Sequence, residues 1–180
     1  LLGSALGIAA KDIDEKVGIL EEHLGGAGAG DAAAPGGAVR LTIQWHVLDE
    51  MARKVETSNN KKTYISGARS VLRMMWFLDF VHALIKNLVE NPEDELRPCA
   101  SKAYDVSLAP HHPWLLRKTV GAALYSLPYR AKFLESVCGS KPEKTAAAGL
   151  AALDQFNSFV GPLREALWAF YREHGIHELP

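Results

Sequence analysis

The sequence has few of the features that mark secreted, membrane-spanning or nucleic-acid-binding proteins. Its two cysteines, Cys99 and Cys138, lie far apart, which favours reduced thiols in an intracellular protein over a disulfide framework. No uninterrupted apolar run reaches the roughly 18 residues that span a bilayer. The best candidate, residues 71–88, contains several charged side chains. Lys and Arg total 20 and Asp and Glu total 21, a formal charge of -1, so no global basic field indicates nucleic acid.

Catalytic and metal-binding motifs are also missing. There is no Gly-x-Ser-x-Gly elbow, no phosphate-cradling glycine loop and no arrangement of paired carboxylates. The adjacent pair His111-His112 lacks the face-sharing spacing of helical metal ligands and has no carboxylate motif beside it. These histidines are expected to be buried or to cap a helix, or one of them to hydrogen-bond a polar ligand atom. We expect no enzyme, no metal and no cofactor.

Helical patterns cover almost the whole chain. Apolar periodicity and stop signals predict helices over residues 6–24, 39–55, 66–89, 102–108, 114–127, 128–137 and 141–174. The last helix should break or kink at Gly161-Pro162. Pro92-Glu-Asp-Glu suits the first turn of a helix, which Pro98 should interrupt. Residues 25–37 predict a flexible Gly/Ala loop. Without alternating strands the class is all-α, as a single domain over 1–180.

Two arginines give the most informative pattern. Arg69 and Arg73 precede Trp76, Phe80 and Leu84 at helical spacing, so all five share one helix face, which the apolar residues predict to be buried. Arginines rarely continue such a face without an anionic partner. The stripe therefore predicts a polar pocket at the edge of an apolar cavity.

The first helix repeats this pattern. Asp12 and Lys16 share a face with apolar residues. If they meet the arginines, the charges of Lys16, Arg69 and Arg73 (+3) and Asp12 (-1) sum to +2, which nearly cancels a phosphate monoester of about -1.5 to -2. The planar arginine fork also suits bidentate phosphate binding. The alternative is a set of ordinary surface ion pairs, worth a few tenths of a kcal/mol each.

An aromatic residue with basic neighbours forms a third pattern. Trp114 follows Pro113 at an expected helix start, and Arg117 and Lys118 lie nearby. The tryptophan could be a core residue. Its amphipathic ring suits a membrane interface equally well, with the two basic residues contacting anionic lipid heads.

Together these segments resemble the glycolipid transfer protein superfamily, most closely its ceramide-1-phosphate-transferring branch. The resemblance runs from about Lys11 to the end and rests on motifs in the same order: Lys11-Asp12-Ile-Asp-Glu-Lys16, Arg69-Ser-Val-Leu-Arg73, Pro92-Glu-Asp-Glu, Ala103-Tyr104, Leu108-Ala-Pro-His-His112-Pro-Trp114, Ser126-Leu127-Pro128 and Glu178-Leu179-Pro180. It implies a two-layer all-helical sandwich. It also implies non-enzymatic transfer of a phosphosphingolipid between membranes, by a cytosolic, monomeric protein that contacts membranes peripherally.

The resemblance also implies roles for single residues. Asp12 and His112 would bind the ceramide amide and a nearby hydroxyl, and Lys16, Arg69 and Arg73 would bind the phosphate. Trp114 matches a tryptophan that presses into the bilayer, with Arg117 and Lys118 beside it. The glycolipid-binding branch has a sugar-stacking tryptophan where Arg73 stands, so arginine there favours phosphate.

Three departures from the family pattern accompany this match. Trp76 and Asp79 replace a basic and a neutral residue, the Gly/Ala loop is unusual, and we expect the family's first helix to be missing from this chain. Two alternatives stay open. One is transfer of a glycosylceramide on the same fold, and the other is a helical protein-interaction module.

Overall fold

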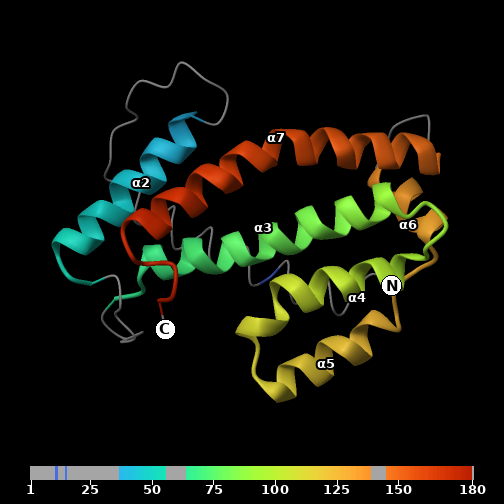
Figure 1. The fold of residues 1–180 in the computed structure, drawn as a ribbon, viewed down its shortest axis with the longest axis horizontal. Helices are drawn as coiled ribbons and strands as arrows, with labels where there is room; N and C mark the ends of the chain where they lie inside the picture. The colour runs from blue at the N-terminus through green and yellow to red at the C-terminus, as the bar shows by residue number, and fades with distance from the viewer. Residues whose placement is uncertain (1–10, 12–14, 16–36, 56–63, 139–144, 180) are drawn as a thin grey trace. The chain divides into compact units, whose positions relative to one another are not determined.

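The computed structural model describes Lys11, Glu15 and residues 37–55, 64–138 and 145–179. These residues form α2 (Gly37–Ala52), α3 (Gly67–Glu90), α4 (Leu96–Ser107), the 3-10 helix η1 (Ala109–His111), α5 (Trp114–Leu124), α6 (Arg130–Val137) and α7 (Ala146–Glu173) (Figure 1). Lys11 and Glu15 are helical and exposed. No strand occurs in these ranges, as predicted. The Gly/Ala loop falls almost entirely outside them.

The chain divides into two compact units. One unit comprises residues 76–162, and the other comprises the described residues from Lys11 to Met75 and from Leu163 onward. Helices α3 and α7 each contribute to both units. The predicted single domain over 1–180 stays a prediction.

The first unit has an apolar core at the junction of α3 and α4. Leu88, Leu96 and Cys99 are almost completely buried. Partly buried residues from α3, α7, α6 and the turn before α6 pack against this core: Leu84, Leu127, Phe133, Leu150 and Leu153. Burial of these apolar side chains stabilises the α3–α4 junction.

Arg130, the first residue of α6, stabilises the same junction by hydrogen bonds. Its guanidinium donates to the carbonyl of Leu88 at 2.6 Å, to that of Asn91 at 3.1 Å and to that of Asp94 at 3.0 Å. The carbonyls at a helix C-terminus have no partners within the helix. Arg130 therefore provides donors for carbonyls at the end of α3 and stabilises the turn that leads into α4.

The predicted start of the fourth helix is wrong. Residues 92–94 form a turn, α4 begins at Leu96, and Pro98 is its third residue rather than an interruption. The backbone N–H groups in the first turn of a helix have no acceptor within the helix. Proline, which has no N–H group, is therefore tolerated there. Glu95, at the N-cap, makes no side-chain cap bond and instead accepts the backbone N–H of Arg130 at 3.0 Å.

The last helix does not break at Gly161-Pro162, because α7 continues from Ala146 to Glu173 with Pro162 inside it; the kink that was the other expected outcome stays a prediction. A proline inside a helix removes one hydrogen bond. The remaining bonds and the packing along both halves of α7 maintain this helix.

The predicted buried face of α3 is only partly buried. The buried apolar residues of α3 are Ala68, Val71, Leu72, Met75, Ile85 and Leu88. The stripe that begins at Arg69 and Arg73 lies on the neighbouring face, where Trp76, Phe80 and Leu84 are only half-buried. The aliphatic residues fill the core, and the arginines border it.

Candidate functional site

The arginine pair lies near the start of α3. Arg69 is partly buried and Arg73, one turn later, is exposed. Burial lowers the pKa of Arg69, and the positive charge of Arg73 lowers it further. Both effects disfavour the charged guanidinium. An anion bound beside the two arginines would favour the charged form. Asp12 and Lys16, predicted to join the pair, lie outside the described residues.

A buried carboxylate fixes the helix that carries these arginines. Glu50, near the end of α2, is completely buried. It accepts the backbone N–H of Gly67 at 2.5 Å and that of Ala68 at 3.0 Å, in the first turn of α3. It also accepts the hydroxyl of Tyr64 at 2.6 Å and that of Ser66 at 2.8 Å. A negative charge at a helix N-terminus is favourable because the free N–H groups point at it.

Further contacts complete this network. His46 Nε2 lies 3.2 Å from the Glu50 carboxylate. Tyr171, fully buried on α7, donates its hydroxyl to the carbonyl of Ala68 at 2.8 Å. A side chain at position 67 would place its Cβ 2.7 Å from His46 Cδ2, so glycine is required there. The network and the bond from Arg69 N to Ser66 Oγ, at 3.2 Å, set the orientation of the first turn of α3.

The electrostatics of Glu50 follow from these bonds. Burial alone raises its pKa, but hydrogen bonds from His46, from Tyr64 and from the backbone of Ala68 and Gly67 more than offset that effect. The pKa of Glu50 is therefore lowered to about 2. Glu50 is a stable buried anion rather than a proton donor.

The sequence patterns did not single out Glu50. Tyr64, Ser66, Gly67 and Ala68, which donate to it, lie 14–18 residues away, beyond the reach of helical periodicity, whereas His46 lies one helical turn before it. The sequence offers one signal for it: an acidic pair, Asp49-Glu50, near the end of a helix, followed by a Ser-Gly helix start.

The predicted amide-binding histidine lies in the other unit. Helix η1 turns the chain back on α4, so that His112 Nδ1 lies 2.9 Å from the hydroxyl of Tyr104. The neighbouring His111 stacks on Trp76, with ring centroids 3.8 Å apart and planes 3° from parallel. Trp76, a departure from the family pattern, therefore packs against the segment that carries His111 and His112.

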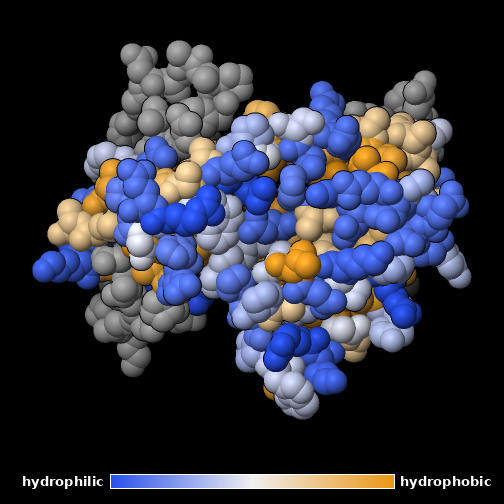
Figure 2. Space-filling view, in the orientation of Figure 1, coloured by the Kyte–Doolittle hydropathy of each residue, from blue (hydrophilic) through white to orange (hydrophobic). Residues whose placement is uncertain are grey.

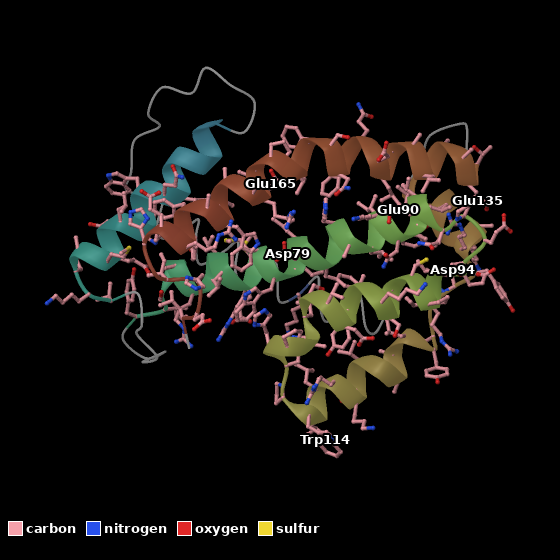
Figure 3. The ribbon with its side chains drawn as sticks, in the orientation of Figure 1. Asp79, Glu90, Asp94, Trp114, Glu135 and Glu165 are labelled. Carbon is pink, nitrogen blue, oxygen red and sulfur yellow. The ribbon has the colours of Figure 1, made fainter. Side chains whose placement is uncertain are left out.

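The predicted membrane-docking residues come together on α5. Trp114, Arg117 and Lys118 line an open groove of about 670 Å³ between α4 and α5, together with Arg97. Trp114 is 64% exposed, and Figure 3 shows it at the start of α5, directed away from α4. In Figure 2 hydrophilic side chains cover much of the visible surface of α4 and α5. No residue of α5 is buried, so this helix keeps its apolar side chains accessible.

The described ranges contain no group of three or more His, Cys, Asp or Glu side chains that could hold a metal ion. In the same ranges no helix has the length and apolar character needed to cross a bilayer.

Comparison with known proteins decides the family. The family model of the glycolipid transfer proteins matches residues 1–139. The chain belongs to the glycolipid transfer protein family. The predicted resemblance is confirmed, and so is the predicted fold class, all-α and of the glycolipid transfer protein type.

Several of the similar proteins are ceramide-1-phosphate transfer proteins. The human ceramide-1-phosphate transfer protein is 28% identical over 181 residues, covering 99% of this chain and 79% of that protein. The protein of the same name from Danio rerio is 31% identical and covers 99% of this chain and 80% of its own length. The crystal structure of the human protein in complex with 12:0 ceramide-1-phosphate matches with a TM-score of 0.79 at 25% identity, covering 99% of this chain and 81% of that one.

Proposed function

We propose that this member of the glycolipid transfer protein family transfers a phosphosphingolipid between membranes, with ceramide-1-phosphate as its preferred cargo and without catalysis. The arginine pair on α3 is the observation that carries this proposal. Two guanidinium groups one helical turn apart, of which Arg69 is partly buried, suit a phosphate better than a neutral sugar. The names of the similar proteins support the same cargo.

The head group then decides which lipid is carried. Burying a methylene is worth about 0.8 kcal/mol, so two long chains supply most of the affinity but little selectivity. A charge-assisted hydrogen bond is worth about 1.5–3 kcal/mol, roughly ten- to a hundredfold. In this proposal Lys16, Arg69 and Arg73 hold the phosphate, and these bonds select phosphosphingolipids over sphingolipids with uncharged heads.

The ceramide amide is recognised by two other residues. In this proposal Asp12 accepts hydrogen bonds from the amide N–H and a nearby hydroxyl, and His112 donates to the amide carbonyl. These contacts are common to all sphingolipids, so they distinguish sphingolipids from glycerolipids rather than one head group from another.

Membrane docking is assigned to α5. The exposed ring of Trp114 would enter the interface, where aromatic side chains are favourable, and Arg117 and Lys118 would contact anionic head groups. Arg97 lines the same groove and adds positive charge. The protein would be cytosolic and monomeric, touching membranes only while it loads or releases lipid.

Trp114→Ala should weaken binding to vesicles that contain anionic lipid by about tenfold, because it removes a large apolar side chain from the interface. Vesicle co-sedimentation measures this change. Trp45→Ala is the matched control, because Trp45 is 55% exposed on α2 and has no role in the proposed docking surface. Equal effects of the two substitutions would contradict the docking assignment.

A transfer assay with two competing cargoes tests the function itself. Labelled ceramide-1-phosphate in donor vesicles should move to acceptor vesicles, and unlabelled galactosylceramide should compete poorly. Preference for galactosylceramide would instead support glycolipid transfer on the same fold. No extraction of either lipid would support a helical protein-interaction module. Mass spectrometry of lipid that co-purifies with the protein would identify the cargo independently.

A further inference from the structure

The side chains of Tyr104 and His112 are hydrogen-bonded to each other. Tyr104 is on α4 and His112 follows η1, and the rings tilt by 46° with centroids 5.6 Å apart. The Tyr104 hydroxyl lies 2.9 Å from His112 Nδ1, which is hydrogen-bond distance. A neutral imidazole carries its single proton on either Nδ1 or Nε2, and the bond made by one nitrogen decides which.

The burial of Tyr104 determines the direction of this bond. Tyr104 is 5% exposed, so its O–H needs an acceptor inside the protein. His112 Nδ1 is the acceptor that the described part of the chain offers it. If Nδ1 carried the proton instead, the Tyr104 O–H would be buried without an acceptor among these residues, which is costly. Tyr104 therefore donates, and Nδ1 accepts.

The phenol stays protonated under ordinary conditions. Burial raises the pKa of Tyr104, and Asp105 raises it further, while Arg117 opposes them. The hydroxyl is consequently a permanent donor at neutral pH.

We propose that Tyr104 is a positioning residue that fixes the neutral tautomer of His112, so that Nε2 carries the proton and donates to the carbonyl of the bound sphingolipid amide. This inference rests on the proposed function, because the carbonyl is the acceptor that the lipid would supply. The other tautomer would present a lone pair at Nε2, which cannot donate to a carbonyl oxygen. The tyrosine thus acts on lipid recognition without touching the lipid.

Backbone geometry supports this role. The backbone N–H of Leu108 donates to the carbonyl of Tyr104 at 3.1 Å, and that of His112 donates to the carbonyl of Ala109 at 3.2 Å. The turn between the two residues is therefore held by main-chain bonds that do not involve the Tyr104 hydroxyl. Tyr104→Phe removes the hydroxyl and leaves these bonds in place.

Nitrogen-15 NMR of the histidine rings tests the proposal directly. In the lipid-free protein at about pH 8.5, well above the ordinary imidazole pKa of about 6.5, the His112 ring should show a protonated Nε2 and an unprotonated Nδ1. His112→Gln identifies the signals. In Tyr104→Phe we expect a mixture of tautomers, and sphingolipid transfer slower by about fivefold. Tyr129→Phe, which removes the hydroxyl of an exposed tyrosine, should change neither the tautomer ratio nor the transfer rate.

A double substitution separates positioning from a general structural effect. In a His112→Gln background, Tyr104→Phe should cause no further loss of transfer, because its effect passes through the imidazole. A protonated Nδ1 in the wild type, an unchanged tautomer ratio in Tyr104→Phe, or normal transfer by that variant would overturn the proposal. If the wild type transfers no sphingolipid, the proposed function fails, while the NMR result still decides the tautomer.

Discussion

Arg73→Leu is expected to abolish ceramide-1-phosphate transfer, lowering its rate by about a hundredfold or more, while the helical content stays at the wild-type level. Arg73 is exposed, so the fold does not depend on its side chain. Its guanidinium would make two parallel bonds to the phosphate, each worth about 1.5–3 kcal/mol. Fluorescence transfer between vesicles measures the rate, and far-UV circular dichroism checks the fold.

Two further variants sharpen this prediction. Arg172→Leu removes an exposed arginine from the last turn of α7 and should transfer lipid normally. Arg73→Lys keeps the charge but loses the planar fork, so it should retain only part of the activity. Normal transfer of ceramide-1-phosphate by Arg73→Leu would rule out the phosphate site on α3.

The helices were predictable because each has a clear apolar repeat, but their limits and faces depend on distant packing. The start of α4 is an example. Pro92-Glu-Asp-Glu has the composition of a helix start, yet α4 begins at Leu96, where the chain can bury Leu96 and Cys99 against Leu88. Local composition carries no information about that core.

The buried face of α3 shows the same difficulty. Two neighbouring faces of this helix carry apolar residues, one led by Arg69 and Arg73 and the other by Val71, Leu72 and Met75. Periodicity alone does not choose between two apolar stripes. The aliphatic face fills the core, and the stripe with the arginines forms its half-buried border.

Short motifs predict candidate residues for the site, but they do not predict the contacts that support those residues. Arg69, Arg73, His112 and Tyr104 all stand in motifs, but the contact of Tyr104 with His112 forms only because η1 folds the chain back over eight residues. Supporting contacts of this kind depend on the turn between the residues, which no pattern of residue types encodes.

Glu50→Gln is expected to destabilise the protein by about 3 kcal/mol at neutral pH. The Glu50 carboxylate is completely buried, and its pKa is lowered from 4.5 to about 2. This lowering of the pKa corresponds to about 3 kcal/mol of stabilisation of the charged form in the folded protein. Glutamine keeps the shape but directs an NH2 group at donors that need an acceptor. Urea unfolding at pH 7 measures the loss.

The same carboxylate predicts how this loss depends on pH. Because the pKa of Glu50 is lower in the folded protein than its ordinary value of 4.5, its contribution is complete above about pH 4.5 and disappears as the pH falls towards 2. The difference in unfolding free energy between wild type and Glu50→Gln should therefore shrink over that range. Glu90→Gln, at an exposed residue 3.9 Å from Lys86, should change stability by less than about 0.5 kcal/mol. A Glu50→Gln difference that stays constant from pH 7 to pH 3 would show that the charge of Glu50 does not hold the start of α3, and that the orientation of Arg69 has another origin.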